Sequence, residues 1–462
     1  TRADFPSTIP RKSASKCIFN SQNTYWPTGM KPNFRLYFAD YGMVLVLLVL
    51  GAYYSWVTWE EQHPTGKSAA TQLSKSITAE HKPGSRIMIV ARANAEDRIF
   101  SQAIRQSLEA DNMVITAEVN GDPGDARKAL EQAQSDGIPI DVIIGNHVTM
   151  NWAVFNDLSS RYSVTANTRF QQPQSYYWPN FLKQENLLNV ANQIVVIAII
   201  AIGMTMVIIT AGIDLSVGSL IALSAAICAW LIRKAGGGPE ATTLAMTACC
   251  LAAILCCGLL GAFSGLMITQ FAIPPFIVTL GMMLVGSGLA FIIADGQSIY
   301  QLPDSFVWLG RGDDFLGLPN AVFLMILLYG IAHVAMTKMR IGRYIYAAGG
   351  NATAARLSGV PVKKVLVTVY TCCGCLAGLG GVITASQLKS GSPTYGLMYE
   401  LYVIAAVVVG GTSLAGGEGK ILGTLIGAFI IAVIQNGMNL TGVESYTQKV
   451  VLGMVILGAV LL

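Results

Sequence analysis

Long apolar tracts separated by short polar turns fill most of this chain beyond residue 187. A helix needs about 20 mostly apolar residues to cross a bilayer. Only 12% of the chain is charged, against about 25% in soluble domains. The pattern predicts ten membrane-spanning helices, near residues 41–59, 190–210, 215–232, 242–268, 276–294, 320–337, 363–386, 400–413, 419–438 and 447–462. The segment 400–413 is short for a full crossing, which leaves a tilted or re-entrant helix as an alternative there.

A segment with the composition of a soluble domain, residues 60–180, follows the first span. Its first part, residues 60–85, is typical of a linker. Short strand patterns and helical patterns then alternate, over residues 86–91, 96–112, 113–119, 123–137 and 140–146. In the first of these helices, the apolar side is expected to carry Ile99, Ala103 and Leu108. The alternation predicts a small α/β insert with a parallel sheet inside an otherwise all-α polytopic membrane protein.

The charges predict how the chain is oriented. The loop 338–364 contains no acidic residue, so the positive-inside rule places it in the cytoplasm; its basic residues are Lys338, Arg340, Arg343, Arg356, Lys363 and Lys364. Counting spans back from this loop puts the N-terminus inside and the insert outside, although Arg233 and Lys234 then fall on the outer side. The predicted parts are a cytoplasmic polar tail, a first span, an extracytoplasmic insert and a helical membrane domain, over residues 1–36, 37–59, 60–180 and 181–462.

Several kinds of site are excluded by the sequence. The net charge of +4 gives no case for nucleic-acid binding. The Gly-Lys-Ser at residues 66–68 lacks the glycine that a phosphate loop needs, because Glu61 stands there. The four histidines are scattered without the spacing of metal ligands. We therefore expect no enzyme activity, no metal and no cofactor in this chain, so uphill transport would need a partner's ATP or an ion gradient.

Eight of the nine cysteines lie in apolar segments. The cluster Cys372, Cys373 and Cys375 is compatible with a metal or redox site, or with small buried hydrophobic side chains. No His, Asp or Glu lies nearby in the sequence, which favours the second interpretation.

Asp214 is a carboxylate inside the apolar stretch from 190 to 232. An ionisable group at membrane depth is rare and is a functional hypothesis, whereas at a helix end near the interface it costs little. Gly212, Ser216, Gly218 and Ser219 around it permit an interrupted helix. The predicted topology places Asp214 near the cytoplasmic face, where it would cap the following helix in a structural or gating role.

Residues 350–360 have the signals of a short helix. Asn351 is suited to the N-cap, alanines follow it, and Gly359 and Pro361 would end it. Such a helix could dock into a groove on a partner protein, or it could be only a tight solvated loop.

Five ordered motifs now point to a family: Ile208–Leu220, Pro274–Met283, Gly342–Val360, Tyr399–Gly419 and Ile434–Val443. With them, the chain from about residue 181 resembles the permease subunits of bacterial ATP-binding-cassette importers for monosaccharides, most closely the ribose permease subfamily. The resemblance implies an inner-membrane protein in contact with lipid, with cytoplasmic ATP-binding subunits that hold ATP and Mg, an extracytoplasmic sugar-binding protein and a second, identical permease protomer. It also implies that ATPase coupling involves Gly350, Asn351, Ala354, Ala355, Arg356 and Gly359.

The long tail and the insert depart from this family. The insert is similar to one lobe of the periplasmic sugar-binding proteins, but it lacks a second lobe and the usual aromatic and Arg/Asp cluster that holds a sugar. A docking or scaffolding role is therefore expected for the insert in preference to an independent binding site.

Polar residues of the spans are candidates for a substrate path or for gating: Asp214, Ser216, Ser219, Glu400, Gln435, Asn436 and Asn439. The alternative for each is a hydrogen bond between helices. The sequence thus predicts import of a monosaccharide, ribose or a related sugar, by alternating access. A membrane sensor whose insert binds a ligand is the rival hypothesis. An ion-driven transporter is disfavoured, because Asp214 and Glu400 have no basic partner within the spans.

Overall fold

A computed structural model describes residues 32–315 and 317–461. The polar tail predicted over residues 1–36 lies almost wholly outside this range. The first described element is helix α1 (Pro32–Val57), whose apolar portion covers Gly42–Val57.

Seven helices of the described part are long and apolar enough to cross a membrane, which confirms a polytopic α-helical protein. They are α7 (Gln184–Ile209), α8 (Val217–Lys234), α9 (Thr243–Gln270), α10 (Pro275–Ile293), α12 (Asn320–Lys338), α15 (Val362–Leu388) and α17 (Ile421–Leu440). The predicted count of ten is therefore not reached. Helix α16 (Tyr399–Val409) has only 11 residues, about 16 Å, which is roughly half of a bilayer's hydrocarbon core. Residues 400–413 therefore do not form a full crossing, and the alternative of a shorter helix applies.

Shorter elements connect and follow these helices. They are η4 (Gly238–Glu240), η5 (Asp304–Val307), α11 (Trp308–Arg311), α13 (Arg340–Gly350), α14 (Ala352–Leu357) and α18 (Ser445–Leu461). Helix α18 lies where the tenth span was predicted, but its 17 residues make it short for a crossing.

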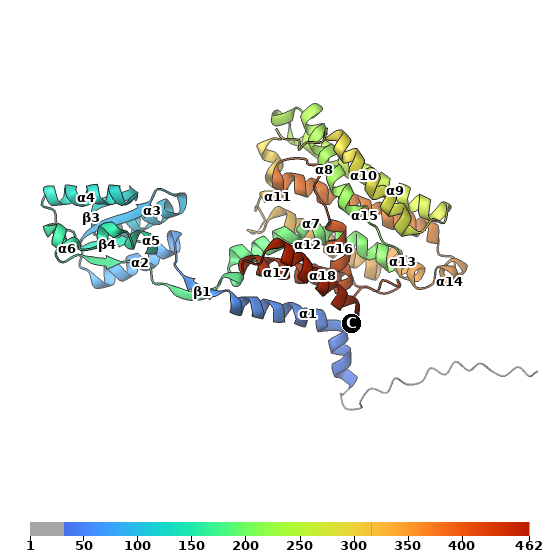
Figure 1. The fold of residues 1–462 in the computed structure, drawn as a ribbon, viewed down its shortest axis with the longest axis horizontal. Coiled ribbons are helices and arrows are strands. Elements are labelled where there is room, and N and C mark those ends of the chain that lie inside the picture. Colours follow the sequence, from blue (N-terminus) through green and yellow to red (C-terminus); the bar gives the residue numbers. More distant parts are fainter. Residues whose placement is uncertain (1–31, 316, 462) are drawn as a thin grey trace, which may run out of the picture. The chain divides into compact units, whose positions relative to one another are not determined.

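Helix α15 is central to the helical part, where it packs against α7, α8 and α9 (Figure 1). Small residues bring these backbones close together. A Cβ atom at Gly203 would lie 2.7 Å from the Cα of Cys373, and one at Gly374 would lie 2.5 Å from the Cys257 carbonyl oxygen. Cys257 and Cys373 are fully buried in this packing. Among the described residues, no group of three or more His, Cys, Asp or Glu could hold a metal ion.

The insert is a three-layer α/β domain, which we call the lobe (Figure 1). Its parallel sheet has the order β3-β2-β4-β5, with strands β2 (Arg86–Arg92), β3 (Val114–Gly121), β4 (Val142–Gly145) and β5 (Arg169–Gln171). The helices packed on it are α2 (Gly66–Glu80), α3 (Ala95–Ala110), α4 (Pro123–Ser135) and the short α6 (Leu158–Arg161).

Side-chain alternation along β2 explains the two helical layers. Ile87 and Ile89 point into the core that α2 and α3 cover, whereas Met88 and Val90 point into the core under α4 and α6. All four side chains are fully buried. A strand buried on both faces is typical of a parallel sheet covered by helices on each side.

Two local predictions for the lobe need correction, and one element was missed. Residues 60–85 are not a linker, because they form β1 (Trp59–Gln62) and then α2, whose Leu73 and Ile77 are buried. The apolar side of α3 includes Leu108 and the partly buried Ala103, as predicted, but Ile99 is 46% exposed, and Phe100 and Ile104 are buried. Strand β5 was missed because a strand of three residues shows only a weak pattern.

An antiparallel ribbon of β1 and β6 (Tyr176–Pro179) joins the chain entering the lobe to the chain leaving it. The Gln62 amide closes it with hydrogen bonds to the Trp178 carbonyl, 3.0 Å, and to Asn180 Oδ1, 3.1 Å. The remaining short helices of this region are α5 (His147–Met150), η1 (Ala153–Phe155), η2 (Ser163–Thr165) and η3 (Asn180–Leu182).

Candidate functional site

The loop between α7 and α8 contains Asp214, which is fully buried. Its Oδ1 atom accepts hydrogen bonds from the Ser216 backbone N–H, 3.0 Å, and from the Ser216 hydroxyl, 2.6 Å. Ser216, and not Asp214, is the N-cap residue of α8. The prediction that Asp214 is the capping residue of this helix is therefore wrong, although its carboxylate accepts the backbone N–H just before the helix begins.

Helix α15 shields this carboxylate. A Cβ atom at Gly212 would overlap the Tyr370 hydroxyl, so the aromatic ring lies directly over the loop. Neither Asp214 Oδ2 nor the Tyr370 hydroxyl has a hydrogen-bond partner within the described residues. Because buried polar atoms without partners are costly, these two atoms mark the loop as a candidate functional region.

An interrupted stretch of chain, residues 389–398, runs between α15 and α16 in a non-helical conformation. It lies against α8 over several turns. A Cβ atom at Gly391 would lie 2.5 Å from the Ala225 carbonyl oxygen, and one at Gly396 would lie 2.5 Å from that of Gly218. Since seven residues of α8 separate these two contacts, the interrupted stretch follows this span for about 10 Å.

Hydroxyl groups are concentrated in the interrupted stretch. Ser392 Oγ and Thr394 Oγ1 lie 2.9 Å apart, and Ser390 contacts the Tyr395 hydroxyl. Ser390 and Ser392 are buried, whereas Thr394 is exposed in the single chain. Irregular backbone at membrane depth is tolerated only where it is buried in protein or lines a water-filled cavity. The interrupted stretch is therefore the strongest structural candidate for a polar path.

Glu400 begins α16, directly after the interrupted stretch. A Cβ atom at Gly218 would overlap Glu400 Oε2, so the half-buried carboxylate rests on the first turn of α8. Ser219 is on the same turn, and its hydroxyl donates to the Ser216 carbonyl, 2.8 Å. The predicted residues Asp214, Ser216, Ser219 and Glu400 thus cluster at the start of α8.

The other three predicted path residues lie elsewhere, near the end of α17. Asn436 and Asn186 exchange two hydrogen bonds, 2.9 and 3.0 Å. Asn439 is exposed and accepts from Gln448, 2.8 Å, while Gln435 is half-buried beside Asn436. Asn186 lies in the first turn of α7, whereas Asp214 lies just beyond the other end of that helix. The group around Asn436 and the group around Asp214 are therefore separated by about 35 Å, the length of α7 between them. The seven residues therefore do not form one site, and Asn436 links two helices.

Helix α14 confirms the short helix predicted at residues 350–360. Asn351 is its N-cap and accepts from the Ala354 backbone N–H, 2.9 Å, and Gly359 follows it with φ +84°. Ala355 is buried at 6% exposure, whereas Ala354 and Arg356 are exposed. Ala355 thus anchors the helix to the protein, and the opposite face is free for another contact.

Helix α13, which precedes α14, contacts the end of α7 and the loop 410–420. A Cβ atom at Gly349 would overlap the Ile209 carbonyl oxygen and lie 2.8 Å from the Gly417 nitrogen. The Gly417 N–H donates to the same Ile209 carbonyl, 2.8 Å. Tyr346 on α13 donates to the Gly419 carbonyl, 2.7 Å. The end of α7 and the loop 410–420 are therefore held against α13 by backbone contacts.

Two features were missed by the sequence analysis. The interrupted stretch was treated as an ordinary loop, although Gly391, Pro393 and Gly396 between two apolar helices are the signal that could have identified it. The second is Leu357 at the end of α14, which is 84% exposed. It is the one large apolar residue of that helix, and it follows Arg356, one of the predicted coupling residues.

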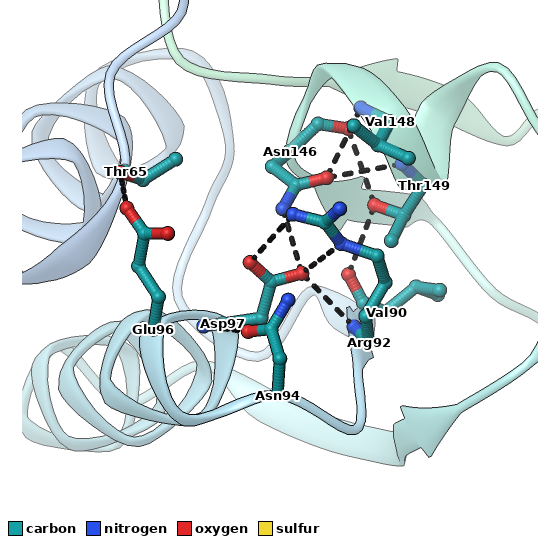
Figure 2. Close-up of polar contacts among 9 residues, drawn as sticks. All are labelled: Thr65, Val90, Arg92, Asn94, Glu96, Asp97, Asn146, Val148 and Thr149. Atoms are coloured by element: carbon teal, nitrogen blue, oxygen red, sulfur yellow. Dashed lines mark hydrogen bonds and ion pairs between the residues drawn. The ribbon is translucent and has the colours of Figure 1, made fainter. Parts of the chain in front are cut away.

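A polar cluster closes the carboxyl ends of β2 and β4 in the lobe, as Figure 2 shows. Buried Asp97 accepts from Arg92 Nε, 2.8 Å, and from Asn146 Nδ2, 2.9 Å. Burial alone would raise the pKa of Asp97, but these hydrogen bonds outweigh it and lower the pKa. Asn146 also caps α5 by accepting from the Val148 and Thr149 backbones, 3.1 and 3.0 Å.

This cluster lies where the strand order reverses, at the edge where open α/β sheets commonly bind ligands. Arg92, at the end of β2, and Asp97, in the first turn of α3, form an ion pair there, 2.8 Å. Their hydrogen bonds are directed at one another, which gives the pair a structural role in the lobe.

The comparisons with known proteins can now be stated. The family described as "Branched-chain amino acid transport system / permease component" matches residues 186–460. The ribose import permease protein RbsC of Escherichia coli (strain K12) is 46% identical over 287 residues, which are 61% of this chain and 87% of that protein. RbsC of Bacillus subtilis (strain 168) is 46% identical over 289 residues, 62% of this chain and 86% of that protein.

The D-allose transport system permease protein AlsC of Escherichia coli (strain K12) is 37% identical over 282 residues, 61% of this chain and 84% of that protein. No solved structure matches the chain. The matched region contains the start of α8, the interrupted stretch and α14, and it excludes the lobe. The predicted family is confirmed: the chain belongs to the permease components of this transport family and is a transport subunit, with its lobe as an addition.

Proposed function

We propose that this chain is the permease subunit of an ATP-driven importer of a monosaccharide, ribose or a closely related sugar. The most similar proteins named above are permeases for ribose and for allose, and they resemble this chain over its membrane part. Because these relatives are transport proteins, the sensor hypothesis is not favoured. The multi-pass chain would lie in a bacterial inner membrane, with the N-terminus and α14 in the cytoplasm and the lobe outside.

The interrupted stretch is the observation that carries the proposal. A neutral sugar needs weak, replaceable hydrogen bonds along its path, which the hydroxyls of Ser390, Ser392, Thr394 and Tyr395 can offer. Thr394 is exposed, and Leu397 beside it is 77% exposed in the single chain. We infer that a second, identical protomer faces this surface, so that the sugar passes between the two interrupted stretches.

Energy would come from a separate ATP-binding subunit that holds ATP and Mg, since this chain has no phosphate loop. That subunit would dock on α14 through Leu357 and the exposed face around Ala354. A displacement of α14 would move α13, and the contact of Gly349 with Ile209 would pass the movement to the loop that holds Asp214. Asp214 and Glu400 would then act in gating at the start of α8, and no step requires them to bind the sugar.

The lobe would serve as an extracytoplasmic docking or scaffolding element for the sugar-binding protein. Its Arg92–Asp97 cluster is closed on itself, which supports a rigid scaffold in preference to an independent sugar site. The two-stranded ribbon of β1 and β6 gives the lobe a paired connection to the rest of the chain.

Uptake of labelled ribose tests the proposed path. The chain is produced with its ATP-binding subunit and sugar-binding protein in a strain that lacks its own ribose permease. Replacement of Ser392 and Thr394 by Ala should lower the uptake rate by about thirtyfold, because two hydrogen bonds of about 1 kcal/mol each are lost. The matched control is Thr337→Ala on α12, whose exposed hydroxyl donates to its own helix at His333, 2.7 Å. Equal uptake by the double variant and the control would contradict the path.

A further inference from the structure

A groove of about 350 Å³ lies between α7, α12, α13 and α15, away from the interrupted stretch. Its walls are apolar, with Met206, Ala332, Ile345 and Leu376 among the lining residues. Two hydroxyls lie in the wall, but Thr368 donates to the Lys364 carbonyl, 2.9 Å, and Thr371 to that of Val367, 2.7 Å. Since both hydroxyls are satisfied by their own helix, the groove suits a hydrocarbon.

The groove is elongated along its helices. It extends from Met336 back to Leu328 on α12, and from Thr368 to Leu376 on α15. Eight residues of helix correspond to about 12 Å, so the groove offers a channel parallel to the spans. A single extended alkyl chain fits such a shape better than a compact molecule does.

One end of the groove is strongly basic. Lys338 ends α12 two residues after the lining residue Met336, and Arg340 and Arg343 alternate on α13 with the lining residues Ile341 and Ile345. Lys364 lies one turn before Thr368, on the same helix α15. All four basic side chains are exposed, and none forms an ion pair with another described residue. This end of the groove therefore offers positive charge to an anion.

We propose that this groove binds one anionic phospholipid, with an acyl chain between α12 and α15 and the phosphate at Lys338, Arg340, Arg343 and Lys364. Clusters of basic residues beside membrane helices attract anionic headgroups. An amphipathic helix such as α13, with isoleucines on one face and arginines on the other, is suited to the lipid interface. The lipid headgroup would hold α13 in place. Because α14 directly follows α13, the lipid would also stabilise the position of α14, which would contact the ATP-binding subunit. The contact of α14 with an ATP-binding subunit rests on the proposed function, whereas the binding of the lipid does not.

Native mass spectrometry of the purified chain tests the binding. The probes are phosphatidylglycerol and phosphatidylcholine with identical acyl chains, offered together at equal concentration. The chain should retain phosphatidylglycerol, and the double variant R340Q/R343Q should bind it about thirtyfold more weakly, because each basic residue is worth about 1 kcal/mol. Ala332→Phe, which fills the groove, should remove the bound lipid altogether. The control pair R233Q/K234Q at the end of α8 should leave retention unchanged.

Equal retention of both lipids by the unmodified chain would overturn the proposal, as would full retention by Ala332→Phe. A disulfide-linked dimer formed through Ala332→Cys in membranes would also overturn it, because a second copy would then cover the groove. Should Ala332→Phe fail to elute as a folded protein, the exposed arginine pair decides the question alone. Loss of ribose uptake with lipid binding intact would count against the proposed function and not against this site.

Discussion

Gly349 of α13 lies directly against the Ile209 carbonyl at the end of α7. A Cβ atom at this glycine would overlap that oxygen and lie 2.8 Å from the Gly417 nitrogen. No side chain is interposed, so a movement of α13 can reach the end of α7 and the loop 410–420 through this backbone contact. The contact links α13, which precedes α14, to the end of α7, which precedes the cluster at the start of α8.

Gly349→Ala should therefore disrupt both stability and coupling. Added atoms in a packed interior typically cost about 1–3 kcal/mol, because backbone must shift to admit them. The expected result is a lower unfolding temperature in detergent and a loss of ATP-dependent uptake. Gly330→Ala on α12 is the matched control, since a Cβ atom there meets nothing within 4 Å. If both variants behaved like the unmodified chain, the close contact would have no mechanical role.

Leu357→Asp should impair docking of the ATP-binding subunit without affecting the fold. The side chain is 84% exposed, so the substitution removes little internal packing. Loss of a central apolar anchor at an interface commonly costs about 2 kcal/mol or more. The measurement is ATPase stimulation by the permease in proteoliposomes, together with co-purification of the subunit. Leu357→Met should retain both the ATPase stimulation and the co-purification. Unimpaired ATPase stimulation by Leu357→Asp would show that Leu357 is not part of the interface.

Ala354 and Ala355 should behave differently, although the sequence treats them alike. A glutamate at exposed Ala354 should uncouple ATP hydrolysis from uptake while the unfolding temperature stays constant. A glutamate at Ala355, which is 6% exposed, should also destabilise the protein, because a charge would be buried. Normal ribose uptake by a correctly inserted Ala354→Glu variant would contradict the assignment of α14 to coupling.

The pH dependence of the lobe should follow Asp97. Its folded-state pKa lies below the unfolded value, so ionised Asp97 stabilises the lobe above the unfolded pKa. This contribution is lost as the pH falls through the folded pKa, below about pH 4. Asp97→Asn should thus destabilise the lobe by about 1–3 kcal/mol at neutral pH, with the deficit disappearing in acid.

Hydrogen exchange of the β2 and α3 peptides in the full-length protein measures this deficit across the pH range. Glu131→Gln on the exposed face of α4 is the control, and it should show no deficit at any pH. A deficit for Asp97→Asn that stayed constant into acid would mean that the charge of Asp97 is not what stabilises the cluster.

Asn186 and Asn436 should contribute to stability and not to transport specificity. Their paired hydrogen bonds join α7 to α17, and such contacts in membrane bundles average about 0.6 kcal/mol. A double-mutant cycle with alanine at both positions should give a coupling energy of that order, with uptake of different sugars changed equally. A change in the uptake of one sugar but not of the others would contradict this and would indicate that Asn436 lies on the substrate path.

The sequence predicted the long helices well, because a tract such as that of α7 or α9 leaves only one structure possible in a membrane. It also predicted α14, since Asn351 and Gly359 act locally. It could not reveal the burial of Asp214, which depends on Tyr370, 156 positions further along the chain. Helix α2 was missed because its apolar side is made largely of alanines among serines and threonines, a composition that also suits a linker.

The interrupted stretch was missed for a different reason. Its serines, threonine and glycines have the composition of an outer loop, and only the contacts of Gly391 and Gly396 with α8 reveal that it follows a span. The separation of Asn436 from Asp214 was likewise hidden, because polarity identifies residues suited to a path but not the end of the bundle at which they lie.

ATP-dependent uptake of labelled ribose into proteoliposomes tests the central claim most directly. The vesicles contain this chain and its ATP-binding subunit, with the sugar-binding protein supplied on the side of the lobe. The account predicts accumulation that requires ATP and all three proteins. Gly349→Ala should abolish this accumulation, and Gly330→Ala should preserve it. Accumulation without ATP, or the absence of uptake for ribose and every related monosaccharide in a correctly assembled complex, would contradict it.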